Sequence, residues 1–133
     1  MRKGIPSFAA RRRNRKRPKS SIEKLVAAWL LADGISFKTE VKVGKCHIDV
    51  VIGKKGAVEL NGCYYHFHPK CYPNQTRKMI MKRIRDRNRM NFLIRKGFNT
   101  YVFWECEILG QPDVVREQLR QIAKKECPEI YNS

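Results

Sequence analysis

The stretch 61–71, NGCYYHFHPKC, gathers side chains that bind metals or transfer protons. It holds two of the three histidines and two of the five cysteines in the chain, interleaved with three aromatic residues. A hydrophobic core needs no such mixture, whereas thiolates and imidazoles are common ligands of transition metals. This segment is therefore the first candidate for a functional site.

Three side chains of this stretch, together with Cys106, are compatible with a zinc site. Cys63, His68 and Cys71 lie in the same segment, and Cys106 comes just past a predicted strand. Structural zinc sites are closed tetrahedra of thiolates and imidazoles. The spacing differs from that of a standard zinc finger. The alternative is that Cys63 and Cys106 are buried thiols and His68 is exposed.

Asp49 is the leading candidate ligand for a divalent cation. It lies in HIDVVI, a hydrophobic strand in which an unpaired carboxylate is costly. Hydrolysis of a phosphate needs such acids and a group that activates water. After a hairpin turn the next strand supplies Glu59 and Asn61, a layout that resembles PD-(D/E)xK with asparagine in place of lysine. We leave His47 out of the site, expecting it on the opposite face of its strand from Asp49.

The charge of the chain predicts a polyanionic partner. There are 29 lysines and arginines against 12 acids, for a net charge of +17. Nucleic acid is the commonest partner of such a protein. Residues 1–19 hold nine of the basic residues and no acid, which predicts a disordered DNA-contacting arm; a solubilising tail or an address sequence is the alternative. The arm residues that we expect to contact DNA are Arg11, Arg12, Arg13 and Arg15.

The hydrophobic pattern predicts a protein without membrane contact. No apolar run is long enough to span a bilayer, and no apolar signal core follows the basic start. An odd number of cysteines without an export signal favours thiols or metal ligands over disulfides. We therefore expect a cytoplasmic protein.

The periodicity predicts a helix, three strands, a helix, a strand and a helix. Ser20 and Glu23 form a capping box at the start of the first helix, and Thr76 caps a long basic helix that ends near Gly97. The expected strands are 36–43, 46–52, 57–61 and 99–105, and the last helix is 112–125. A helical crossover before the fourth strand permits parallel pairing, so we predict an α/β fold with a mixed central sheet flanked by helices.

Four segments together resemble the very short patch repair (Vsr) endonuclease family, whose fold is PD-(D/E)xK-like (restriction-endonuclease-like). They are DVV at 49–51, NGCYYHFHPKC at 61–71, RDRNR at 85–89 and KGFNTYVFWEC at 96–106. The similarity covers roughly residues 20–110. It extends to related homing endonucleases with the EDxHD arrangement. The implied organisation is an arm (1–19), a Vsr-like endonuclease domain (20–127) and a tail (128–133), in a bacterial or phage-encoded protein.

The resemblance implies a catalytic set of Glu23, Asp49, His66 and Asp86. Asp49 and the backbone carbonyl of Leu60 would bind Mg²⁺. His66 would act as general base or water activator. Glu23 and Asp86 would hold the water shell and orient the histidine.

The resemblance also implies further ligands, and each catalytic assignment has a plainer alternative. Cys63, His68, Cys71 and Cys106 match the structural zinc ligands of the family, and Glu59 is an additional candidate for the Mg²⁺ site. From the residues alone, Glu23 is explained as a helix cap, Asp86 as a surface acid paired with neighbouring basic residues, and His66 as a buried histidine.

The DNA-contacting residues follow from the same resemblance. Tyr64 and Tyr65 stand where the family places aromatic wedges between base pairs, although one of them packing in the core is the alternative. The other predicted contacts are Asn61, Lys82, Arg85 and Arg89. Asn61 replaces a histidine that is common in repair members, and Tyr-Tyr replaces Phe-Trp. These departures bear on mismatch specificity more than on hydrolysis.

We therefore expect a Mg²⁺-dependent endonuclease that cleaves or nicks double-stranded DNA, of the homing type. It would act as a monomer or as a dimer assembled on DNA. A T:G mismatch-nicking repair endonuclease is one alternative. The other is a non-catalytic, zinc-stabilised DNA-binding module.

Overall fold

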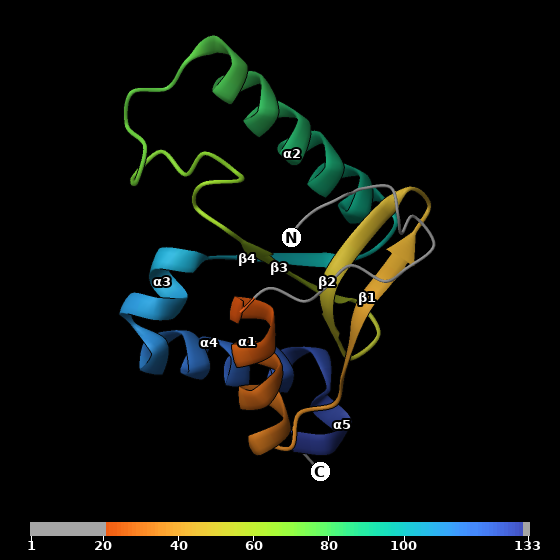
Figure 1. Cartoon of the computed structure of the whole chain (residues 1–133). Coiled ribbons are helices and arrows are strands. Elements are labelled where there is room, and N and C mark those ends of the chain that lie inside the picture. The colour runs from red at the N-terminus through yellow and green to blue at the C-terminus, as the bar shows by residue number, and fades with distance from the viewer. Residues whose placement is uncertain (1–20, 132–133) are drawn as a thin grey trace, which may run out of the picture.

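The computed structural model describes residues 21–131, in which helices lie on both faces of one sheet (Figure 1). The elements are α1 (Ser21–Ala32), β1 (Phe37–Val43), β2 (Cys46–Ile52), β3 (Gly56–Asn61), α2 (Arg77–Arg95), β4 (Asn99–Trp104), α3 (Glu105–Gly110), α4 (Pro112–Glu126) and α5 (Pro128–Tyr131). The capping contact predicted for Ser20 and the basic arm lie outside the described residues. The division into arm, domain and tail stays a prediction.

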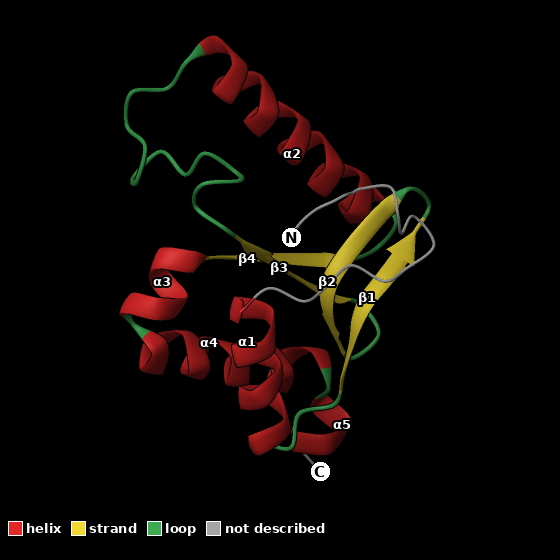
Figure 2. Cartoon of the chain, viewed as in Figure 1, coloured by secondary structure: helices red, strands yellow, loops and turns green. Residues whose placement is uncertain are grey.

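The strands form a mixed sheet in the order β1-β2-β3-β4 (Figure 2). The first three strands pair antiparallel in sequence order, and β4 pairs parallel with β3 after the α2 crossover. In that parallel pair Leu60 lies opposite Phe103 and Asn61 opposite Trp104. The predicted α/β class with a mixed sheet is confirmed.

Each face of the sheet has its own hydrophobic cluster. On one face α1, α3 and α4 pack through residues such as Val26, Leu30 and Leu119. On the other face the end of α2 packs through Leu93, the only residue of that helix classed as buried. In Figure 1 the rest of α2 rises away from the sheet, on the side opposite α1 and α4. No helix between residues 21 and 131 is long and apolar enough to cross a bilayer.

The boundaries of α2 match the prediction. The Thr76 side chain accepts a hydrogen bond from the backbone N–H of Met79 at 3.2 Å. Gly97 has a φ of +96°, a left-handed conformation that glycine adopts without strain. A long basic helix thus follows the segment that holds the predicted zinc ligands Cys63, His68 and Cys71.

The chain after β4 differs from the prediction. Residue 105 was expected in the strand, but β4 ends at Trp104 and α3 begins at Glu105. The carboxylate of Glu107 accepts the Trp104 N–H at 2.9 Å, which caps a helix too short to show a periodic pattern. The C-terminal segment also contains α5, which the sequence analysis assigned to a tail.

Replacing Asp33 by asparagine is expected to destabilise the protein at neutral pH. Asp33 follows α1 and accepts hydrogen bonds from Arg116 at 2.9 Å and from Arg120 at 3.1 Å. The bond from Arg116, assisted by Arg120, holds the pKa of Asp33 below its ordinary value of 3.8. A lowered folded-state pKa contributes stability that is present above 3.8 and is lost as the pH falls through the folded-state value.

Urea unfolding of both proteins between neutral pH and about pH 2 measures this effect, because the difference in midpoint should shrink in acid. Asp113→Asn is the control, since Asp113 is an exposed acid in the first turn of α4. An equal destabilisation by Asp33→Asn at every pH would contradict the ion-pair explanation.

Candidate active site and metal-binding loop

Asp49 sits in β2 with its carboxylate largely removed from water. Its Oδ2 accepts the backbone N–H of Leu60 in β3 at 2.8 Å. Burial, followed by the nearby charge of Glu59, raises the pKa of Asp49 to about 7. An acid in this environment is poorly stabilised as an anion, and a bound cation reverses that balance.

Two more acids lie close to Asp49. One carboxylate oxygen from each of Glu23, Glu40 and Asp49 lies within 4.8 Å of the others. Glu23 comes from the first turn of α1 and Glu40 from β1. Oxygen ligands from several carboxylates are what hard divalent cations require, so this group fits the predicted cation. The predicted contribution of the Leu60 carbonyl stays a prediction.

Sequence reasoning missed Glu40. In FKTEVKV it looks like one charged residue in an alternating surface strand. Only the antiparallel register, which pairs Thr39 with Val50 and Val41 with Ile48, sets Glu40 against Asp49. No local signal in the sequence shows that register.

Glu59 is a buried carboxylate beside Asp49. Its residue is 3% exposed, and burial raises its pKa although Arg89 opposes the shift. Oε1 accepts a hydrogen bond from Arg89 at 2.8 Å. Oε2 is buried and has no hydrogen-bond partner within the part of the chain that the structure describes. An orphaned buried oxygen next to an acidic cluster also fits a cation, as proposed for Glu59 from the sequence.

Arg89 is held inside the site. Its guanidinium donates to Glu59 and to the backbone oxygen of His47. These two contacts give Arg89 a structural role. Its contact with DNA stays a prediction. Arg85 on the same helix is exposed.

The exclusion of His47 was wrong. His47 lines the same cavity as Asp49. On a regular strand, residues two positions apart share a face, so alternation by itself gave no reason to place His47 and Asp49 on opposite faces.

His66 and Asp86 form a hydrogen-bonded pair across the loop and α2. His66 Nδ1 lies 2.9 Å from Asp86 Oδ2, and Lys82 pairs with the other oxygen. Burial alone would raise the pKa of Asp86, but the hydrogen bonds from His66 and Lys82 outweigh it and lower that pKa. Because an ionised carboxylate only accepts hydrogen bonds, Nδ1 carries the proton and Nε2 has the lone pair. This is the tautomer that a general base requires.

These side chains surround one cavity of about 590 Å³. The four predicted catalytic residues Glu23, Asp49, His66 and Asp86 all line it. So do the candidate ligands Leu60 and Glu59, and the predicted DNA contacts Asn61, Tyr65, Lys82 and Arg89. The structure thus brings the predicted catalytic residues together in one space.

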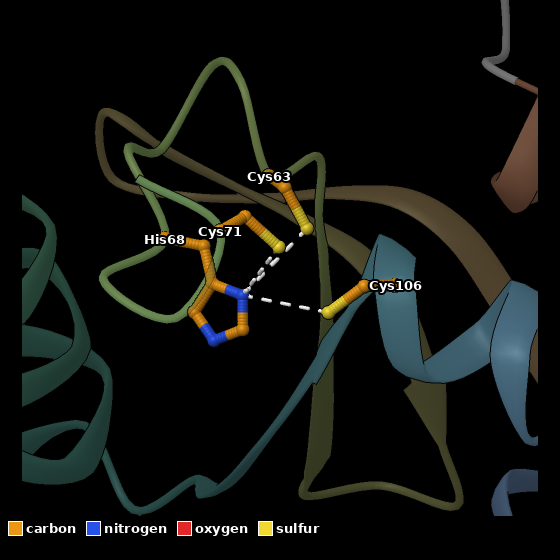
Figure 3. Close-up of side chains that lie close together, drawn as sticks. All are labelled: Cys63, His68, Cys71 and Cys106. Atoms are coloured by element: carbon orange, nitrogen blue, oxygen red, sulfur yellow. Dashed lines mark hydrogen bonds between the residues drawn. The ribbon is translucent and has the colours of Figure 1, made fainter. Parts of the chain in front are cut away.

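The four predicted zinc ligands also converge (Figure 3). One ligand atom from each of Cys63, His68, Cys71 and Cys106 lies within 4.8 Å of the others. His68 Nδ1 is 3.7, 3.6 and 3.5 Å from the sulfurs of Cys63, Cys71 and Cys106. The alternative of unrelated thiols does not explain this convergence. Cys106 reaches the group from the first turn of α3, so the unpredicted helix positions the fourth ligand.

The electrostatics of this cluster suit a soft cation. Burial raises the pKa of Cys63 to about 12, so its thiol keeps the proton unless a cation displaces it. Burial also lowers the pKa of His68, which favours the neutral imidazole that ligates metals. The donor set of three thiols and one imidazole fits Zn²⁺.

The two neighbouring tyrosines of the loop are exposed, and Tyr65 lines the cavity. Tyr64 is 63% and Tyr65 is 75% exposed, and their rings meet edge to face at 5.3 Å. The alternative that one of them packs in the core is therefore wrong. Exposed apolar rings of this size beside a basic helix are available to a ligand.

The fold is α/β, with a mixed four-stranded sheet flanked by helices. It matches the catalytic domain of the homing endonuclease I-Bth0305I with a TM-score of 0.61 and 22% identity, covering 82% of this chain and 99% of that domain. The chain is also similar to the DNA mismatch endonuclease Vsr of Escherichia coli (strain K12). That relative is 25% identical over 112 residues, 77% of this chain and 71% of its own length. The resemblance seen in the sequence is confirmed, although no protein-family model matches the chain.

Proposed function

We propose that this protein is a divalent-cation-dependent endonuclease that hydrolyses phosphodiester bonds in duplex DNA. The observation that carries the proposal is the shared cavity, in which the His66–Asp86 pair faces the acids around Asp49. Similarity to two DNA endonucleases and a net charge of +17 support a DNA substrate.

The residues of the chain divide the work of hydrolysis. His66 takes a proton from the attacking water at Nε2, while Asp86 fixes the ring through Nδ1 and stabilises the imidazolium that forms. Asp49 and Glu23, with the Leu60 carbonyl, hold Mg²⁺, and Glu59 is a further candidate ligand. When bound, the cation supplies Lewis-acid stabilisation of the charge that develops on the phosphate.

Duplex DNA is held by the surfaces around the cavity. Tyr64 and Tyr65 are exposed enough to insert between base pairs and bend the duplex towards the acids. The basic residues of α2, Arg85 among them, contact phosphates. We infer a homing-type enzyme, in keeping with the match to the homing endonuclease domain.

The Cys63, His68, Cys71 and Cys106 cluster holds a structural Zn²⁺ in this proposal. Four protein ligands close the coordination sphere and leave no position for a substrate. The zinc ion therefore fastens the loop that carries His66, and takes no part in the reaction.

A plasmid-nicking assay tests the proposed activity. With Mg²⁺, wild type should cut supercoiled DNA and Asp49→Ala should be at least about 100-fold slower, because the principal cation ligand is lost. Both proteins should bind DNA equally well in a gel-shift assay. Asp113→Ala, in an exposed acid of α4, is the control that keeps activity.

If wild type and Asp49→Ala are equally inactive and both still bind DNA, the proposed endonuclease activity is rejected. The protein would then be a zinc-stabilised DNA-binding module.

Mismatch nicking is the second candidate, favoured by the similarity to the mismatch endonuclease. Matched and T:G-mismatched duplexes of one sequence distinguish the two. Cleavage confined to the mismatched duplex would identify a repair enzyme, and equal cleavage of both would support the homing type.

A further inference from the structure

Glu40 adopts a conformation that its residue type avoids. Its φ is +54°, in the left-handed region, although it lies in the middle of β1. Residues other than glycine, asparagine and aspartate rarely occupy this region, and a strand normally requires extended backbone. Such strain persists only where the surrounding structure imposes it, and it concentrates at functional sites.

The partner strand is irregular at the same position. Ile48 belongs to the hydrophobic cluster under α2, whereas Val50 belongs to the cluster under α1. Residues two apart on a regular strand share a face, so the alternation of β2 breaks at Asp49. Pairs in register flank this point on both sides, and Glu40 and Asp49 face each other between them. The distortion of both strands is therefore centred on these two acids.

The distortion gathers acids. It leaves the carboxylate of Glu40 within 4.8 Å of those of Glu23 and Asp49. Like charges at this separation repel one another, and a proton on one carboxylate or a bound cation relieves the repulsion.

A second observation, independent of the acidic cluster, also points to a ligand at this site, and it concerns Glu59. Its residue is 97% buried, and it lines the cavity together with Glu23 and Asp49. Its Oε2 has no hydrogen-bond partner among residues 21–131. Arg89 pairs with the other oxygen, Oε1, at 2.8 Å. Buried oxygens of this kind are satisfied by water or by an ion.

We propose that Glu40 is a ligand of the divalent cation, together with Glu23 and Asp49. The left-handed backbone conformation at Glu40 brings its carboxylate to the other two acids. Three carboxylates from α1, β1 and β2 favour a hard cation such as Mn²⁺ or Mg²⁺ over a soft one. The inference rests on the proposed function in that this is the cation the endonuclease uses. The strained backbone allows β1, an edge strand of the sheet, to place the carboxylate of Glu40 beside that of Asp49.

Calorimetric titration of Mn²⁺ into the full-length protein, with its thiol site already loaded with zinc, tests the proposal. Glu40→Gln keeps the size and backbone of the side chain and removes its charge, so we expect Mn²⁺ affinity to fall at least about tenfold. Glu117→Gln, in an exposed acid of α4, should bind Mn²⁺ as wild type does.

Glu40→Gly supplies a second readout, which does not depend on activity. Glycine accepts a φ of +54° without strain and removes the charge, so the cation-free protein should melt at a higher temperature than wild type. Mn²⁺ should then raise the melting temperature of wild type much more than that of Glu40→Gly.

The outcomes separate this proposal from the proposed function. Unchanged Mn²⁺ affinity in Glu40→Gln, or no Mn²⁺ binding by wild type, overturns the role of Glu40 even if wild type cuts DNA. Mn²⁺ binding that depends on Glu40 in a protein that cuts no DNA would establish the ligand and reject the endonuclease.

Discussion

Cys71→Ser should release zinc and lower the melting temperature more than any other substitution considered for this protein. Ligands to structural zinc contribute directly to folding, because the free energy of binding the ion stabilises the folded state. In peptides that fold only around zinc this free energy is about 10–16 kcal/mol. Here the sheet has its own core, so we expect part of that amount to appear as lost stability.

The loss of structure in Cys71→Ser should be confined to the loop and the start of α2. The segment 62–76 contains turns but no helix or strand, and in α2 only Leu93 is buried. The loop and the first turns of α2 therefore depend on the Cys63–His68–Cys71–Cys106 cluster for their position. The two hydrophobic clusters do not, so the body should remain folded.

Native mass spectrometry and calorimetric melting test this together. Wild type should carry about one zinc ion per chain, and Cys71→Ser should carry none. Cys46→Ser is the matched control, since Cys46 lies in β2 outside the cluster and should leave zinc content unchanged. Wild-type protein without bound zinc would defeat the assignment.

His66→Ala should slow DNA cleavage by about 10²–10⁴-fold, the usual range for loss of a general base. Asp86→Asn should have a smaller effect of at least about tenfold, because it disturbs the ring without removing it. An asparagine amide can donate to Nδ1 and so favours the tautomer with its proton on Nε2. That tautomer cannot accept the proton of water.

Single-turnover cleavage with saturating DNA measures both rates. DNA affinity and zinc content should match wild type, which separates a chemical defect from misfolding. Added imidazole should restore part of the rate to His66→Ala and none to Asp49→Ala, since it replaces a lost base but not a lost cation ligand. A His66→Ala protein with wild-type rate would show that another group activates water.

Trp104 connects the two metal regions. Its indole stacks on the ring of His68 at 4.0 Å with an interplanar angle of 9°, and it meets His66 edge to face at 6.3 Å. A single aromatic side chain at the end of β4 thus contacts a predicted zinc ligand and the proposed base. The crowding of 61–71 is explained by this arrangement, because one loop must face two sites at once.

The features that could be predicted from the sequence are those that depend on residues close together in the chain. The cap at Thr76, the strand periodicities and the glycine stop at Gly97 are local, and they define the element order and the mixed sheet. Three of the four thiol and imidazole ligands lie within nine residues, so their grouping needs no knowledge of the fold. Asp49 stood out because a carboxylate in an apolar strand needs a compensating partner.

Contacts between side chains that are far apart in the sequence became visible only in the folded protein. Glu40 became a member of the acidic cluster through the register of β1 on β2, and Arg89 paired with Glu59 through the packing of α2 on the sheet. Neither contact has a local signature, because charged residues on a strand or helix usually face solvent. Register and packing are selected by the burial of whole hydrophobic faces, and polar contacts at their edges follow from that choice.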